Sequence, residues 1–297
     1  MVHDVIALTG ATGSLGRRLA LRLAAEGASQ RLIVRDPSRA PRLPGAQVAV
    51  ADGYADTAAM TAALHGASAM FLVSGRESPD RVMQHVAAID AAVATGVAHV
   101  VYLSFLGAAP ACTFTLGRDH WMTEQYLGRR AAESGMRWTA LRSSLYHQGW
   151  VRWVGADGVL RGPAGTGRVA SVSHDDLADV ATAVLLDDHP EHHDRTTYDV
   201  TGPALLNLDE VAAELTVTTG RPVTYHPETV EEAYESRARY QAPRFEVDGW
   251  VTSYTAIASG ELAIVSSTVE RFAGRPAQTF HDWLEVNPEE WQGLLAR

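Results

Sequence analysis

A glycine-rich turn between a short apolar run and an amphipathic segment constrains the fold of this chain more than any other feature. Residues 9–16 read TGATGSLG, directly after the apolar run 5–8 and at the start of a segment with helically spaced leucines. Glycines at this GxxGxxG spacing allow a tight turn, close approach of the backbone to a ligand and close contact between helix and strand. The start of the helix offers free amide groups to a pyrophosphate. The turn therefore predicts a dinucleotide site formed by Thr9, Gly10, Thr12, Gly13, Ser14, Leu15 and Gly16.

The first half of the chain alternates short apolar runs with helical patterns. Helical spacing of apolar residues extends over about 78–96, and a second helix is expected over about 118–135. Continuous apolar runs separated by helices are typical of parallel strands buried on both faces. We therefore predict an α/β fold, a doubly wound parallel-sheet Rossmann domain. Its further strands are expected at residues 31–34, 47–50, 69–73, 97–103 and 138–141.

The second half is expected to return to this sheet once and then to form a smaller unit. Residues 146–170 contain several glycines and are predicted to be loops. Ser173 is a candidate N-cap for the next helix, a strand is expected at 197–200, and helices are expected near 208–219 and 228–239. The predicted domains are a Rossmann domain of residues 1–150 with 171–203, and a smaller, mostly helical substrate-binding subdomain of residues 151–170 with 204–297.

The charged residues exclude several classes of chemistry. All 25 basic residues are arginine, and 35 acidic residues give a formal net charge of -10. A chain without lysine cannot form a Schiff base through a side chain, and it has no lysine to lower the pKa of a tyrosine. The acidic balance argues against nucleic-acid binding, which needs a basic face. Cys112 is the single cysteine, so an intrachain disulfide and a multi-cysteine zinc site are excluded.

Membrane and metal partners are not expected either. No apolar run approaches the roughly 18 to 20 residues that a membrane helix needs, and no signal segment is recognised at the N-terminus. We therefore expect a cytoplasmic protein with no membrane partner. The histidine-rich tract 189–194 reads as a solvated connection after a helix, where adjacent histidines rarely converge on one metal ion.

The end of the second predicted strand indicates which dinucleotide is bound. Arg35 stands there, where an acidic residue would bind the ribose hydroxyls of NAD, and its guanidinium can clamp a 2′-phosphate. The neighbouring Asp36 weakens this interpretation, and an alternative is that Arg35 only pairs with Asp36 or Asp52 at the surface. We favour NADP(H) over NAD(H). The other expected cofactor contacts follow the third and fourth strands, and they are Asp52, Gly53, Val73, Ser74 and Gly75.

With these residues in place, the chain resembles the NmrA-like, atypical branch of the short-chain dehydrogenase/reductase superfamily. The resemblance runs nearly end to end and includes TGATGSLG at 9–16, VRDPSRA at 34–40 and VVYLSFLGA at 100–108. The spacing from His120 to Glu124 is typical of the quinone-oxidoreductase-like members. The resemblance implies an NAD(P)-binding Rossmann protein. By analogy with other superfamily members it also implies a homodimer.

One departure from the superfamily shapes the expected reaction. The tyrosine and lysine of the usual proton relay correspond to Leu116 and His120 here, and only the serine is retained, as Ser104. A quinone tolerates a weak acid, because its reduced anion is aromatic and comparatively stable, whereas a simple ketone would need a real proton donor. The resemblance and this departure together imply an NADPH-dependent oxidoreductase that transfers hydride to a quinone or a related flat, conjugated carbonyl compound.

Several side chains are candidates for the reaction itself. Glu124 lies one helical turn from His120, so it either holds the imidazole or pairs with an arginine. Each candidate also has a purely structural alternative, such as capping, core packing or a bond to backbone. The candidate catalytic residues are Ser104, His120 and Tyr146. The candidate substrate-binding residues are Phe105, His147, Trp150 and Trp153, the two tryptophans being placed in the loop after the sixth strand.

Two other functions fit the same residues. Some NmrA-like proteins bind NADP(H) or NAD(H) without turnover and act as redox-sensing regulators through a protein partner, which the missing tyrosine–lysine pair would suit. The fold could also serve a tailoring enzyme of a biosynthetic pathway, because fold alone does not determine the reaction.

Overall fold

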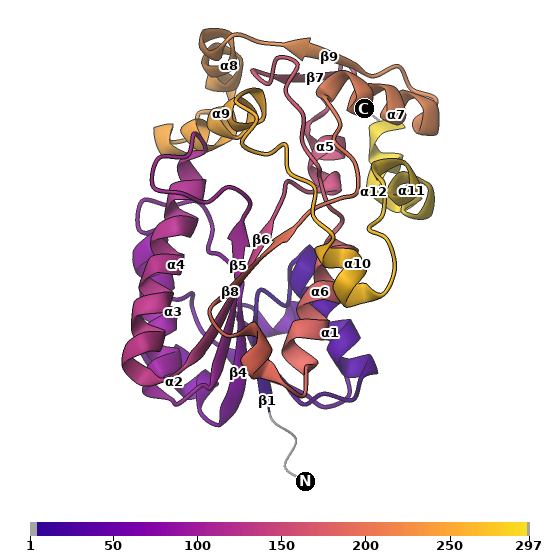
Figure 1. Cartoon of the computed structure of the whole chain (residues 1–297). Helices are drawn as coiled ribbons and strands as arrows, with labels where there is room; N and C mark the ends of the chain where they lie inside the picture. Colours follow the sequence, from indigo (N-terminus) through magenta and orange to yellow (C-terminus); the bar gives the residue numbers. More distant parts are fainter. Residues whose placement is uncertain (1–4, 296–297) are drawn as a thin grey trace.

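The computed structural model describes residues 5–295, and its centre is a seven-stranded parallel sheet with the order β3-β2-β1-β4-β5-β6-β8 (Figure 1). The strand order reverses between β1 and β4, as it does in doubly wound folds that bind a ligand at that point. The α/β Rossmann prediction is therefore confirmed. The strands are β1 (Val5–Thr9), β2 (Gln30–Val34), β3 (Ala46–Val50), β4 (Ala67–Leu72), β5 (His99–Phe105), β6 (Arg137–Ser143) and β8 (Thr196–Val200).

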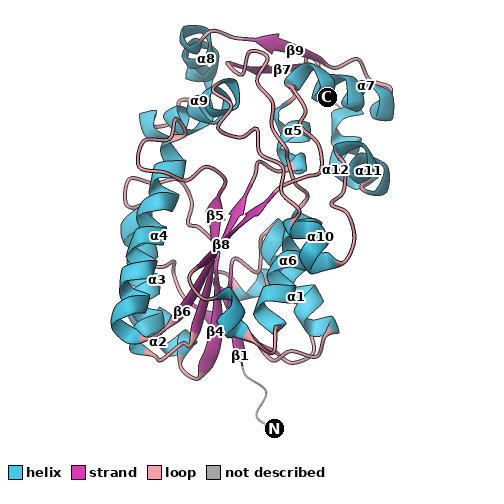
Figure 2. Cartoon of the chain, in the orientation of Figure 1, coloured by secondary structure: helices cyan, strands magenta, loops and turns pink. Residues whose placement is uncertain are grey.

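Helices cover both faces of this sheet (Figure 2). Each face has its own apolar core, one between the sheet and α1 with α6, the other between the sheet and α2 with α3. Ser173 caps α6 as predicted, because its side chain accepts a hydrogen bond from the amide of Asp176. The first layer contains α1 (Ser14–Ala25), α6 (His174–Leu186) and α10 (Thr268–Ala273), and the second contains α2 (Thr57–Leu64), α3 (Arg81–Ala94) and α4 (Thr115–Ser134).

A smaller region lies beyond the carboxyl ends of the sheet strands (Figure 1), and a third core, which includes Trp150 and Trp283, holds it together. Its parallel strand pair is β7 (Val159–Gly162) with β9 (Thr224–Pro227). Its helices are α5 (His147–Trp153), α7 (Leu208–Thr219), α8 (Val230–Arg237), α9 (Arg244–Ala258), α11 (Phe280–Val286) and α12 (Pro288–Leu295). Three short 3-10 helices complete the described chain, η1 (Pro37–Arg39), η2 (Pro190–His193) and η3 (Ala238–Tyr240).

Two sequence predictions are wrong in detail. Residues 146–170, expected to be loops, contain α5 and β7, which are too short for an apolar period to be recognised. Strand β3 is not buried on both faces: it forms an edge of the sheet, and Val48 and Val50 are 45% and 54% exposed. The division into two domains stays a prediction, and its outermost residues, 1–4 and 296–297, lie outside the described residues. Among residues 5–295, no helix is long and apolar enough to cross a membrane.

Candidate active site

The turn between β1 and α1 has a shape that only glycine permits at two positions. Gly10 has a φ of 69°, in the left-handed region. A Cβ atom at Gly16 would lie 2.2 Å from the carbonyl oxygen of Gly10. Helix α1 then begins after Gly13, where no side chain caps it and its first turn carries no acidic residue. The amide groups at its start therefore remain free to bind an anion such as a pyrophosphate.

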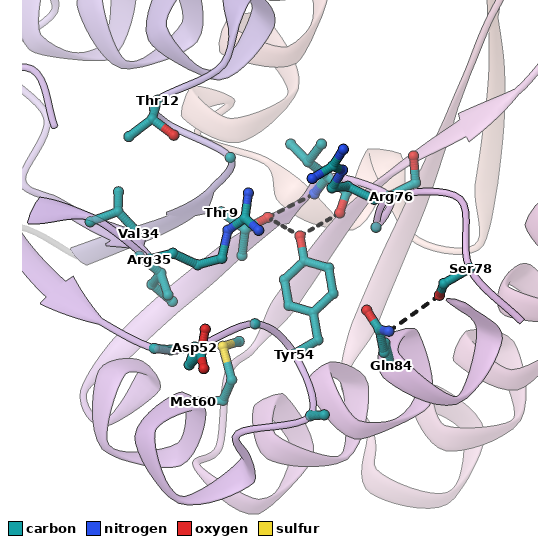
Figure 3. Close-up of a pocket in the computed structure, with 18 residues that line it drawn as sticks. Thr9, Thr12, Val34, Arg35, Asp52, Tyr54, Met60, Arg76, Ser78 and Gln84 are labelled. Carbon is teal, nitrogen blue, oxygen red and sulfur yellow. Dashed lines mark hydrogen bonds between the residues drawn. The ribbon is translucent and has the colours of Figure 1, made fainter. Parts of the chain in front are cut away.

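This turn opens into a cavity of about 420 Å³, which we call the glycine-turn cavity (Figure 3). The cavity lies at the carboxyl ends of β1, β2, β3 and β4, and the strand order of the sheet reverses between β1 and β4. Gly13, Ser14, Leu15 and Gly16 form the turn and the start of α1, and they do not line the cavity itself. The predicted cofactor residues that line it are Thr9, Gly10, Thr12, Arg35, Asp52, Gly53, Val73, Ser74 and Gly75.

Tyr54 is a lining residue that sequence reasoning missed, although it stands beside the predicted Asp52 and Gly53. Its hydroxyl lies 2.5 Å from the carbonyl oxygen of Val73 and 2.9 Å from Oγ1 of Thr9 (Figure 3). Thr9 in turn accepts a hydrogen bond from the amide of Val73 over 2.8 Å. Burial raises the pKa of Tyr54 to about 12, so the hydroxyl keeps its proton. These bonds fix the loop after β4 against the end of β1.

Arg35 extends from the end of β2 into the glycine-turn cavity (Figure 3). Its guanidinium has no hydrogen bond or ion pair with any residue in the described range 5–295, so the alternative of a surface pair with Asp36 or Asp52 is not found there. Asp36 instead accepts hydrogen bonds from the amide and hydroxyl of Ser38, over 2.9 and 2.6 Å, and caps η1. Arg76, which the sequence analysis did not select, lines the same cavity from the loop after β4.

Ser104 lies on β5 and faces α4, where it is almost completely buried. Its hydroxyl donates to Oε1 of Glu124 over 2.5 Å. Arg142 donates two further hydrogen bonds to the same carboxylate, over 2.9 and 2.6 Å. Glu124 therefore pairs with an arginine, the second of the two roles expected for it. Because the Ser104 hydroxyl hydrogen is held by a buried carboxylate, the expected donation to a substrate carbonyl does not fit this geometry.

His120 is also buried, and both nitrogens of its ring are engaged. Arg81 donates to Nε2 over 2.9 Å, and Nδ1 lies 2.9 Å from the hydroxyl of Tyr102. Because a guanidinium only donates, Nε2 is the acceptor and Nδ1 carries the hydrogen. Burial and the charge of Arg81 hold the pKa of His120 well below its usual range. The imidazole is therefore neutral, and it does not fit the expected proton donor with a pKa near neutrality.

Tyr146 follows the end of β6 and is only partly buried. Its hydroxyl lies 3.0 Å from Oγ of Ser143, and its ring centre lies 4.3 Å from that of His174. Burial raises the pKa of the Tyr146 hydroxyl, and the hydrogen bond with Ser143 offsets only part of that rise. Tyr146 is therefore a weak acid beside the carboxyl ends of the strands.

A second cavity, of about 750 Å³, lies between α5 and the α8–α9 segment. We call it the aromatic cavity, because its lining includes Phe114, Trp153, Tyr240, Trp250 and Tyr254. The two cavities adjoin in sequence at one loop, since residues 76 and 78 line the first and residue 77 lines the second. An acceptor in the aromatic cavity would thus lie next to the loop that closes the glycine-turn cavity.

Of the four residues expected to bind substrate, Trp153 lines the aromatic cavity, and it does so from helix α5 and not from a loop. Trp150 is completely buried, with its ring centre 5.1 Å from that of Trp153. His147 is buried against Ser171, and Phe105 packs on Phe114 with ring centres 4.8 Å apart. None of these three side chains lines the aromatic cavity, and His147 lines a separate cavity of about 250 Å³ together with Ser171 and Phe280.

The histidine-rich tract also differs from its expectation. His193 is buried, where it pairs with Asp187 over 2.9 Å and with Tyr198 over 3.0 Å, so the connection is not fully solvated. No group of three or more histidine, cysteine or acidic side chains within residues 5–295 is arranged to hold a metal ion.

Comparison with known proteins identifies the family. A family model described as NAD(P)H-binding matches residues 10–188. The chain is 32% identical over 288 residues to the NAD(P)H azoreductase of Xenophilus azovorans, across 95% of this chain and 98% of that protein. It is 35% identical over 292 residues to the (4-alkanoyl-5-oxo-2,5-dihydrofuran-3-yl)methyl phosphate reductase of Streptomyces griseus, across 96% of this chain and 98% of that protein.

A solved structure gives the same result. The crystal structure of the NADPH-dependent quinone oxidoreductase QOR2 of Escherichia coli, complexed with NADPH, matches with a TM-score of 0.84 and 32% identity, across 95% of this chain and 99% of that chain. These matches extend over both cavities and confirm the resemblance read from the sequence. The chain therefore belongs to the NAD(P)H-binding family of Rossmann-fold proteins, and within it to the NAD(P)H-dependent reductases.

Proposed function

We propose that this protein is an NADPH-dependent reductase whose acceptor is a quinone or a related flat, conjugated carbonyl compound. The observation that carries the proposal is the placement of the two cavities. The glycine-turn cavity holds the elements that a dinucleotide needs, and the loop of residues 76–78 contributes lining residues to both cavities. Aromatic walls suit a flat ring system, which stacks or packs edge-on against them.

The preference for NADPH over NADH rests on Arg35. Its guanidinium lies in the glycine-turn cavity without a carboxylate partner in the described chain, and Asp36 is turned toward Ser38. A free guanidinium at the end of the second strand can bind a 2′-phosphate through two parallel hydrogen bonds. Arg76 adds a second positive charge to the same cavity.

The protein's own groups favour an acceptor that needs little acid catalysis. The bound cofactor would supply the hydride. The chain has no lysine, the Ser104 hydroxyl is held by Glu124, and His120 is neutral with both nitrogens engaged. Tyr146, the remaining candidate, lines neither cavity. We infer that the chain supplies no strong acid to the acceptor, and that Ser104 and His120 position strand β5 and helix α4 around the site. A reduced quinone anion is stable enough to take its proton from a weak acid or from water.

The names of the relatives support the same class of acceptor. One relative is an azoreductase, another a quinone oxidoreductase, and a third reduces a dihydrofuranone phosphate. Each of these names describes a conjugated acceptor of hydride. The homodimer implied by the resemblance stays a prediction.

Binding and turnover can be measured in one experiment. Purified protein is titrated with NADPH and, separately, with NADH, and the fluorescence of the nicotinamide is followed. A simple quinone is then added to the same cuvette. We expect tighter binding of NADPH and rapid quinone-dependent loss of its fluorescence. Tight binding without consumption by any of several quinones would contradict the proposal and would favour a sensor without turnover.

A further inference from the structure

The aromatic cavity carries positive charge, although the chain as a whole is acidic. Its lining contains four arginines and one glutamate, whereas the formal net charge of the protein is -10. The negative net charge of the protein repels anions in general. An anion is therefore expected to bind only where positive side chains gather, as they do in this cavity. The charged residues of the lining are Arg152, Arg161, Arg237, Arg239 and Glu77.

Two of these arginines are neutralised by carboxylates of the protein. Arg237 is buried and donates to Oε2 of Glu228 over 2.7 Å, and it also donates to the backbone. Arg161 forms two hydrogen bonds with Asp157, over 3.1 and 2.6 Å. These two side chains form part of the cavity wall, but each guanidinium is already paired with a carboxylate of the protein.

The other two arginines keep most of their charge. Arg239 is exposed, its guanidinium lies 4.9 Å from the ring centre of Tyr240, and it has no carboxylate partner within residues 5–295. Arg152 is exposed and lies 3.7 Å from Glu290, a carboxylate that also bonds to Arg18 over 3.4 Å. Both guanidiniums therefore have donors available for an anion that enters the cavity.

Each of these two arginines stands beside an aromatic ring of the lining. Arg152 precedes Trp153 on α5, and Arg239 precedes Tyr240 in η3. The Tyr240 ring meets Trp250 edge-on, with ring centres 5.9 Å apart. The cavity thus pairs an apolar, aromatic surface with cationic groups at two of its walls.

We propose that this cavity selects acceptors that combine a flat aromatic ring with an anionic group, such as a carboxylate, sulfonate or phosphate, and that Arg239 and Arg152 bind that group. The reduction of the ring rests on the proposed function, whereas the binding of the anion does not. Glu77 lies on the loop shared with the glycine-turn cavity and repels an anion there. The anionic group is therefore directed away from this loop, and the reducible part of the molecule is directed toward it.

The kinetic test compares 1,4-naphthoquinone with its 2-sulfonate in the wild type and in R239Q, R152Q and the double variant. For each protein, kcat/KM for the sulfonate is divided by kcat/KM for 1,4-naphthoquinone. Dividing the ratio of a variant by the ratio of the wild type then cancels the difference in intrinsic reactivity between the two quinones. We expect R239Q to lower this ratio about tenfold, because a charge-assisted hydrogen bond is lost. R239K should retain part of the preference. R244Q is the matched control, since Arg244 lies nearby on α9, is exposed and does not line the cavity.

Binding is measured separately so that the outcome does not depend on turnover. Calorimetry follows the binding of 2-naphthalenesulfonate and of neutral 2-naphthol, neither of which is a quinone, to the protein with NADP⁺. We expect the sulfonate to bind more weakly in R239Q and at high salt, and the naphthol to bind equally in both proteins. Sulfonate binding that depends on Arg239 without reduction of any quinone would support the anion site and reject the proposed function. The anion site is rejected if the double variant binds both compounds with the affinities of the wild type. It is also rejected if the affinity for 2-naphthol falls as much as the affinity for 2-naphthalenesulfonate.

Discussion

Arg81 donates a hydrogen bond over 2.9 Å to Nε2 of His120, and this bond fixes the buried imidazole in its neutral form. The hydroxyl of Tyr102 occupies the other ring nitrogen. A protonated His120 would face the positive charge of Arg81, whose own ion pair is with Asp119 over 3.4 Å. We therefore expect His120, which the resemblance aligns with the lysine of the superfamily, to have a structural role, and this role has a measurable consequence for stability.

The protein is expected to lose stability as the pH falls below about 6.5, because its buried histidines resist protonation. Burial lowers the pKa of His85 and His174 to about 3 and that of His99 and His147 to about 4, and that of His120 lies well below its usual value. In the unfolded chain a histidine titrates near pH 6.5. Between pH 6.5 and 4 the unfolded chain therefore binds protons that the folded chain does not, and the free energy of unfolding falls by about 1.4 kcal/mol per pH unit for each such histidine.

Chemical denaturation of the wild type, H120N and H65N at pH 7, 6 and 5 measures this contribution. H120N should show a shallower loss of stability between pH 6 and 5 than the wild type, by about the share of one histidine. His65 is exposed, so H65N should keep the slope of the wild type. Equal slopes in all three proteins would mean that His120 is protonated in the folded state.

The Ser104→Ala substitution separates a structural serine from a catalytic one. Ser104 donates its hydrogen to Glu124, so its removal should lower the free energy of unfolding by about 1 to 2 kcal/mol. We expect kcat/KM for quinone reduction to change by less than about threefold, because no transition-state bond is lost. S134A is the control for stability, since Ser134 lies at the exposed end of α4. A hundredfold loss of kcat in S104A, with stability unchanged, would assign the hydroxyl to the reaction.

The choice between NADPH and NADH is expected to depend on Arg35. R35Q should raise the dissociation constant for NADPH about tenfold or more, and it should leave that for NADH within about twofold, because only NADPH carries the 2′-phosphate. Fluorescence titration of both nucleotides gives the four constants. R42Q removes the same charge from an exposed position outside the glycine-turn cavity, and it should alter neither. If R35Q weakens both nucleotides equally, Arg35 does not contact the 2′-phosphate.

The fold and the cofactor turn could be predicted because their signals are local. Strand β1, the glycines of residues 10–16 and helix α1 are contiguous in the sequence, and at Gly10 and Gly16 the shape of the turn requires glycine. A helix was predicted near residues 208–219, and α7 has these bounds in the structure, where Asn207 caps its start and Gly220 ends it. The short apolar run of β3 was interpreted as a strand buried on both faces, although the strand order of a doubly wound sheet places the third strand at its edge.

The roles of Ser104 and His120 depended on partners distant in the sequence. Glu124 accepts the hydrogen bond of Ser104 and is itself bound by Arg142, and Arg81 reaches His120 from a different helix. A resemblance aligns residue types with positions, but it does not show which hydrogen bonds those residues have already made. For the same reason Trp150 could not be distinguished from Trp153, although the structure buries one and leaves the other in the aromatic cavity.

The Gly16→Ala substitution tests whether the turn is a binding site or architecture alone. The new Cβ atom would lie 2.2 Å from the carbonyl oxygen of Gly10, so the turn must move away from the start of α1. We expect binding of both NADPH and NADH to weaken at least about tenfold, because the helix amides no longer meet the pyrophosphate. Gly128→Ala is the matched control, since it also adds a Cβ to a helical glycine but meets only an ordinary contact at 3.6 Å from Trp138. Circular dichroism should show the native helix content in both variants, and unchanged nucleotide affinity in G16A would mean that the turn does not bind the pyrophosphate.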